Sequence, residues 1–242
     1  MPIEAVLDHV AIAVSDRDVA AQRWAGELGG GTLARAEQAR FAVMQLRFAG
    51  DGKLELLSPP PLDRDPDNFV RRFLDRFGAG IHHITLKVPD LGRAVATVRD
   101  AGYDVVDVDD RDPLWHEAFL RPSQVGGLVV QLARQGDTDE QWAARTGTVP
   151  EAPRPGAAEL RGPLLAHPDL DAAGALWALL GAEVSREGER VIARWPGSAL
   201  SIATVAGAPA GPRGLRFAGS GSLPPDNAAG PPVLEESGRD RA

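Results

Sequence analysis

The chain of 242 residues carries a net charge of −8, contains 43% hydrophobic residues and has no cysteine. The length suffices for one large domain or two small ones, and without cysteine a bound metal must be held by nitrogen and oxygen ligands. The acidic balance disfavours nucleic acid as a partner, and without a long apolar run or a signal-peptide pattern at Met1-Pro2-Ile3-Glu4 we expect a cytoplasmic protein with no membrane partner.

The first predicted module is a strand, a helix and three further strands. Residues 5–14 alternate apolar with small or polar side chains, as a strand does, and residues 16–28 have helical spacing that ends at three glycines. Strand-like segments follow at residues 32–36, 40–48 and 53–57. Residues 59–66 then predict a linker and residues 69–77 a short helix.

A second module of the same kind begins at Gly78. Its first strand is followed by a helix at residues 90–101 and by strands at residues 104–107, 115–120 and 128–132. The motif Leu7-Asp8-His9-Val10-Ala11-Ile12-Ala13-Val14 recurs here as Ile81-His82-His83-Ile84-Thr85-Leu86-Lys87-Val88. The two segments therefore predict an internal repeat.

A third, degenerate module follows a proline-rich stretch. An offset of 153 residues places Gly162 on His9 and Trp177 on Trp24, and strands are expected at residues 189–195 and 199–205. Gly162 and Ser201 then occupy the positions of the polar residues in the earlier copies, so this module lacks metal ligands. Residues 214–218 could begin a fourth copy, whereas the composition from Ser220 onward is typical of disorder.

The repeat brings candidate metal ligands to equivalent positions. His9 and His83 lie in the first strand of each module, and Glu55 and Gln131 lie in an apolar run in the last strand. If the two modules pair about a pseudo-twofold axis, these four side chains converge on a site for a divalent ion of the Mn, Fe, Co, Ni or Zn type. Alternatively, each histidine is a packed core residue and Gln131 a buried hydrogen-bonding amide.

Repeats of this pattern resemble the vicinal oxygen chelate superfamily, which includes glyoxalases, bleomycin resistance proteins and extradiol dioxygenases. Residues 7–132 are most similar to methylmalonyl-CoA epimerase through the segments 7–14, 54–59, 80–84, 119–122 and 126–132. The resemblance implies an α+β fold of paired βαβββ modules around a cleft, with a third degenerate module. We expect a paired domain at residues 1–135, a linker at 136–157, the degenerate module at 158–218 and a disordered tail at 219–242.

The implied chemistry is proton transfer at a carbon next to a carbonyl, on an acyl thioester or another dicarbonyl compound. The resemblance makes Glu37 the candidate base, although a solvated strand end is an alternative for this residue. His82 is expected to point away from His83, since side chains alternate along a strand. Trp115 and His116 are candidate substrate contacts, with solvent exposure as the alternative for His116.

Two departures from the family leave the function open. Gln131 stands where the family has a carboxylate, and residues 109–115 replace the family's loop before the penultimate strand. A metal-dependent isomerase or epimerase is therefore one hypothesis, with a related lyase or ring-cleaving dioxygenase as a variant. The other is a non-catalytic, resistance-type protein that binds a small molecule. The chain is expected to be a monomer or a homodimer, and the third module could replace a dimer partner.

Overall fold

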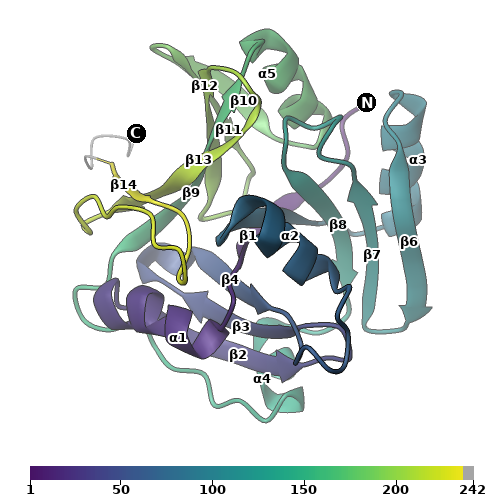
Figure 1. The fold of residues 1–242 in the computed structure, drawn as a ribbon. Helices are drawn as coiled ribbons and strands as arrows, with labels where there is room; N and C mark the ends of the chain where they lie inside the picture. Colours follow the sequence, from purple (N-terminus) through teal and green to yellow (C-terminus); the bar gives the residue numbers. More distant parts are fainter. Residues whose placement is uncertain (237–242) are drawn as a thin grey trace. The chain divides into compact units, whose positions relative to one another are not determined.

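The protein has an α+β fold with two β-sheets, seen in a computed structural model that describes residues 1–236. The first sheet has the strand order β2-β3-β4-β1-β5-β8-β7-β6, and the second has the order β10-β11-β12-β9-β13-β14 (Figure 1). The first strand of each module pairs in parallel with the last strand, and the intervening strands pair antiparallel. The expected paired βαβββ architecture is therefore confirmed.

The first module follows the expected order. Asp16 caps the short helix α1 by accepting hydrogen bonds from the backbone of Asp18 and Val19, and a π-helical turn at Gln22–Glu27 continues it. The module and its connecting helix comprise β1 (Val6–Ala13), α1 (Arg17–Ala21), β2 (Gly31–Glu37), β3 (Ala42–Arg47), β4 (Lys53–Ser58) and α2 (Phe69–Phe77).

The second module repeats this arrangement. Asp90 caps helix α3, whose apolar side packs against the three strands that follow it. The module comprises β5 (Gly80–Lys87), α3 (Leu91–Asp100), β6 (Val105–Asp112), β7 (Trp115–Leu120) and β8 (Val129–Gln135).

The third module is complete and the fourth is reduced to two strands. Helix α5 packs on β10, β11 and β12, and β14 pairs in parallel with β13 as β4 does with β1. The segment between β13 and β14 contains no helix. These elements are β9 (Glu159–His167), α5 (Leu170–Leu179), β10 (Glu183–Glu187), β11 (Arg190–Arg194), β12 (Ser201–Ala206), β13 (Gly211–Ala218) and β14 (Val233–Glu235).

Contacts divide the chain into two units that interleave along the sequence. One unit takes residues 1–9, 83–136 and 162–213, and the other takes residues 10–82, 137–161 and 214 onward. In the second unit, α2 and α4 (Asp139–Arg145) contribute Val70 and Trp142 to an apolar cluster with Val43 and Leu57. The domain boundaries proposed from the repeat thus describe sequence modules, whereas the contact units cut through the first strand of each module.

Two segments differ from the sequence-based expectation. The expected linker at residues 136–157 contains α4, which begins at a Thr138 capping box. The expected disordered tail contains β14, and a turn in which Asp226 pairs with Gly230 precedes that strand. The described part of the tail ends at residue 236, and the expectation for residues 237–242 lies outside the described residues. Within residues 1–236, no helix has the length and hydropathy that a membrane span needs.

The strand pairing of the third module corrects the residue that was aligned with Glu55. His9 precedes Ala11 by two residues, and Ala11 pairs with Glu55. Gly162 likewise precedes Leu164 by two residues, but Leu164 pairs with Ala203. The counterpart of Glu55 is therefore Ala203 and not Ser201, because strand pairing and not the length of the connection decides which residues are neighbours.

Candidate metal centre

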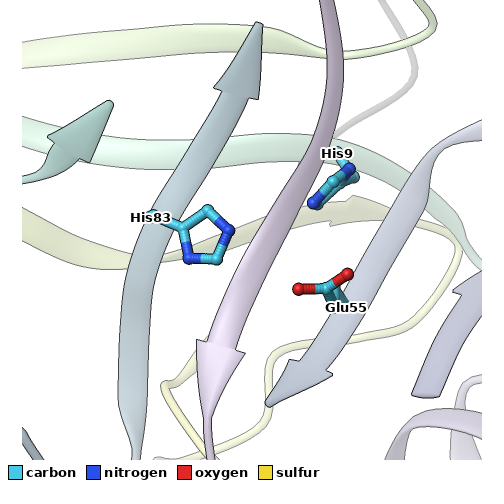
Figure 2. A group of neighbouring side chains, drawn as sticks. All are labelled: His9, Glu55 and His83. Carbon is cyan, nitrogen blue, oxygen red and sulfur yellow. The ribbon is translucent and has the colours of Figure 1, made fainter. Parts of the chain in front are cut away.

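Three candidate ligands come together in the structure. His9 on β1, His83 on β5 and Glu55 on β4 each offer a ligand atom, and these atoms all lie within 4.8 Å of one another (Figure 2). The rings of His9 and His83 lie 6.0 Å apart between centroids. Both histidines are buried, whereas Glu55 is half-buried. The repeat predicts these three side chains together with Gln131 as the ligands of one metal ion, and this role stays a prediction.

The donor set fits a divalent transition metal. Imidazole nitrogens and carboxylate oxygens bind such an ion at about 2.0–2.2 Å, which places neighbouring ligand atoms about 3–3.5 Å apart. Side chains whose ligand atoms lie within 4.8 Å reach this spacing through small rotations. His9, Glu55 and His83 would hold the ion, with substrate or water completing its coordination.

A salt-bridged aspartate orients His9. The Nδ1 atom of His9 lies 2.8 Å from Oδ2 of Asp8, and Oδ1 of the same carboxylate lies 2.9 Å from Nζ of Lys87. A carboxylate can only accept the hydrogen bond, so Asp8 fixes a proton on Nδ1 and leaves Nε2 as the ligand atom. Sequence reasoning missed Asp8 and Lys87, although the Asp-His pair in the first motif was visible.

Thr85 connects His9 to Gln131. The buried hydroxyl of Thr85 lies 3.0 Å from Nε2 of His9 and 2.6 Å from Oε1 of Gln131. Gln131 also donates from Nε2 to Oε2 of Glu117 over 2.7 Å. The amide of Gln131 thus has a partner on both polar atoms, and a role as a metal ligand stays a proposal.

Trp115 lies on the same side of β7 as Glu117, and His116 lies on the other. The indole Nε1 of Trp115 donates to Oε2 of Glu117 over 2.8 Å. Strand β7 has regular pairing with β8, so its side chains alternate between the two sheet faces. The structure therefore connects Trp115 to the hydrogen-bonded chain at Gln131 and directs His116 to the opposite face.

The structure does not bring Glu37 to the three ligands. Glu37 pairs with Ala42 in the β2–β3 hairpin, and Gln45, three residues further along β3, pairs with Glu55. Because side chains alternate, Glu37 and Glu55 point to opposite faces of the sheet. Glu37 is exposed there and forms an ion pair with Arg17. The position of Glu37 in the sequence, 18 residues before Glu55, gave no information about the sheet face on which its side chain lies.

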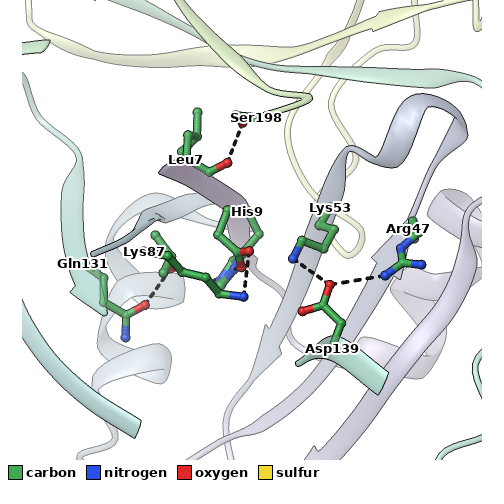
Figure 3. A network of polar contacts seen from close by, with 10 residues as sticks. Leu7, His9, Arg47, Lys53, Lys87, Gln131, Asp139 and Ser198 are labelled. Carbon is green, nitrogen blue, oxygen red and sulfur yellow. Dashed lines mark hydrogen bonds and ion pairs between the residues drawn. The ribbon is translucent and has the colours of Figure 1, made fainter. Parts of the chain in front are cut away.

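A further ion-pair cluster lies on the sheet face that carries Glu55. Oδ2 of Asp139 lies 3.0 Å from Nζ of Lys53 and 3.3 Å from Nη2 of Arg47 (Figure 3). Lys53 precedes Glu55 by two residues on β4 and so shares its face. Helix α4, which carries Asp139, is thereby attached to the strands next to the candidate ligands.

His82 has a packing role and gives the fold a pH dependence. Its ring lies 4.9 Å from the ring of Phe73 and 5.8 Å from that of Phe69, and burial lowers its pKa to about 4. An unfolded histidine titrates near pH 6.5, so the unfolded chain binds more protons between these values. The stability that the neutral ring contributes is complete above about pH 6.5 and is lost as the pH falls towards 4.

We expect the free energy of unfolding to fall by about 2 kcal/mol more in the wild type than in His82→Phe between about pH 7 and about pH 4.5. Urea denaturation at the two pH values measures this difference. Equal losses in the two proteins would show that His82 is not the group responsible.

The comparisons with known proteins agree with this geometry. Residues 8–119 match the family model of the Glyoxalase/Bleomycin resistance protein/Dioxygenase superfamily. The chain is 30% identical over 131 residues to the ethylmalonyl-CoA/methylmalonyl-CoA epimerase of Cereibacter sphaeroides, and the match covers 52% of this chain and 95% of that protein. It is 29% identical over 131 residues to the mitochondrial methylmalonyl-CoA epimerase of Dictyostelium discoideum, covering 52% of this chain and 76% of that protein.

A solved structure extends the likeness to almost the whole fold. A hypothetical protein from Staphylococcus aureus has a TM-score of 0.64 and 10% identity, and the match covers 96% of this chain and 99% of that chain. The chain belongs to the glyoxalase/bleomycin resistance protein/dioxygenase superfamily.

Proposed function

We propose that the protein is a metal-dependent isomerase of the epimerase kind, which moves a proton on a carbon next to a carbonyl group. The observation that carries this proposal is the cluster of His9, Glu55 and His83, whose donor types and spacing suit a divalent ion. Identity of about 30% to acyl-CoA epimerases supports an acyl thioester or a similar dicarbonyl compound as the substrate.

Different residues around the proposed site would have different roles in such a reaction. A bound divalent ion would polarise a substrate carbonyl oxygen and so make the neighbouring proton easier to remove. Asp8 holds the ring of His9 in one tautomer, and Lys87 holds Asp8 in place through its ion pair. The ligands His9 and His83 are both buried, which limits the access of bulk water to them.

Metal content tests the first part of the proposal. We expect near-stoichiometric divalent metal in protein purified without a chelator and loss of that metal in a His9→Ala/His83→Ala double variant, measured by elemental mass spectrometry. His167→Ala is the matched control, because His167 ends β9 in the second sheet and is bonded to the backbone of Asp169. This variant should keep the metal.

Solvent exchange tests the second part. The metal-loaded protein should catalyse deuterium incorporation from heavy water at the α-carbon of methylmalonyl-CoA. Metal without exchange would favour a lyase or a ring-cleaving dioxygenase. No metal in the wild type, even after incubation with cobalt, manganese, iron and zinc salts, would contradict the proposal and favour a small-molecule-binding protein of the resistance type.

A further inference from the structure

Removal of an α-proton needs a base that is not already neutralised by a cation. Several carboxylates have such a partner: Asp8 is paired with Lys87, Asp139 with Lys53 and Arg47, and Asp109 with Arg111. Glu55 belongs to the proposed ligand set. Glu117 differs from all of these, because the two hydrogen bonds that it accepts come from neutral groups.

The geometry of Glu117 leaves one of its oxygens available. Both donors, Nε2 of Gln131 and Nε1 of Trp115, bind Oε2 at 2.7 and 2.8 Å. Within residues 1–236, Oε1 accepts no hydrogen bond. These two hydrogen bonds hold the side chain in one orientation. Because the side chain is only half-buried, it is still accessible to a small molecule. Two donors on one oxygen fix a carboxylate while the other oxygen can take a proton.

A short chain of hydrogen bonds connects Glu117 through Gln131 to Thr85, which lies against His9. Gln131 bonds Glu117 on one side and Thr85 on the other, and the Thr85 hydroxyl lies 3.0 Å from Nε2 of His9. His83 lies on β5 two residues before Thr85, and therefore on the same sheet face. Gln131 thus spaces the carboxylate from the imidazoles and holds it in a constant position.

We propose that Glu117 is the group that takes and returns the α-proton, a role that rests on the function proposed above. The C–H bond breaks as its proton passes to Oε1, and the electron pair moves into the substrate carbonyl to give an enolate. The Glu117 carboxylic acid exchanges this proton with solvent and returns a hydron to the same carbon. No oxidant or further reactant is needed. Trp115 and Gln131 act as positioning residues through their bonds to Oε2.

The test is Glu117→Gln, assayed by deuterium incorporation into methylmalonyl-CoA. The glutamine carbonyl can still accept from Trp115 and Gln131, so the hydrogen bonds persist while the base is lost. We expect the exchange rate constant to fall by about 10²–10⁴-fold, a usual contribution of a general base. Metal content and KM should stay near wild type. Asp110→Asn, the same change at an exposed neighbouring carboxylate, should retain wild-type exchange.

A rescue experiment separates a base from a structural group. In Glu117→Ala, added formate should restore part of the exchange, because a small carboxylate can occupy the vacated space. Wild-type exchange in Glu117→Gln, or its loss in Glu37→Gln instead, would overturn the role of Glu117 and leave the proposed function intact. Absence of exchange in the metal-loaded wild type would overturn both, whereas a variant that also loses its metal would show Glu117 to be structural.

Discussion

Gly162→Ala is expected to destabilise the protein by about 4 kcal/mol or more, the range of exceptional single substitutions. Gly162 has a φ of +110°, and a Cβ atom there would lie 2.2 Å from the carbonyl oxygen of Ser201. Neither the backbone conformation nor the space admits a side chain, and the nearest atom is backbone that cannot rotate away. Since Gly162 stands where the first module has His9, the third module has no room for an imidazole.

A matched control separates backbone strain from collision. Gly188 has a φ of +60° and nothing within 4 Å of an added Cβ, so Gly188→Ala should cost only about 1 kcal/mol. Urea denaturation followed by circular dichroism measures both variants. If Gly162→Ala were no less stable than Gly188→Ala, the close approach of Gly162 to Ser201 would be absent in solution.

Trp24→Ala is expected to cost about 3–5 kcal/mol, the usual range for a fully buried tryptophan. The Trp24 side chain is fully buried, its ring stacks on Phe217 at 6.1 Å, and Nε1 donates to the carbonyl oxygen of Ala229 over 2.7 Å. The neighbouring Arg23 donates to the carbonyl oxygen of Pro224 over 2.7 Å. The variant therefore loses both the apolar packing and an attachment of the segment between β13 and β14. Urea denaturation gives the total, and limited proteolysis reports on that segment.

The equivalent tryptophan of the third module provides the control. Trp177 is also buried and packs on Trp195 at 6.2 Å, but its Nε1 has no hydrogen-bond partner in the described part of the chain. Replacement by phenylalanine keeps most of the ring and removes the N–H group. Trp24→Phe should therefore cost about 1–2 kcal/mol more than Trp177→Phe. Equal costs would contradict the contribution assigned to the bond with Ala229.

The repeat was sufficient to predict the order of the modules and the proximity of His9, Glu55 and His83. It also predicted Gln131 as a fourth ligand, and the metal-binding role of all four stays a prediction. Alternation with a period of two places His9 and His83 on one face of their strands, and a repeated motif makes their positions equivalent. The parallel pairing of first and last strands then follows from the module, and it brings Glu55 next to β1. These features depend on local pattern and on symmetry, both of which a sequence contains.

Strand register and contacts to the backbone could not be predicted from the sequence in the same way. A register shift of one residue moves every side chain of a strand to the other sheet face. The number of residues between Glu37 and Glu55 could therefore not show that the two side chains point to opposite faces. The segment between β13 and β14 has the composition of a disordered tail, yet Trp24 and Arg23 bind its carbonyl oxygens. Every residue has a backbone carbonyl group, so the composition of a segment does not show which of these groups accept hydrogen bonds. Glu117 likewise depends on the pairing of β7 with β8, which a single strand pattern does not reveal.

Ion pairs within the chain hold His9 in place without any metal ion, since Asp8 is bonded to Nδ1 of His9 and Lys87 to Asp8. The protein can therefore complete its fold before a metal arrives, unlike small domains that fold only around their metal. Uptake would add a metal–nitrogen bond at Nε2 of His9, the atom that the tautomer set by Asp8 leaves without a proton. Occupancy would then depend on the free concentration of the metal relative to its dissociation constant.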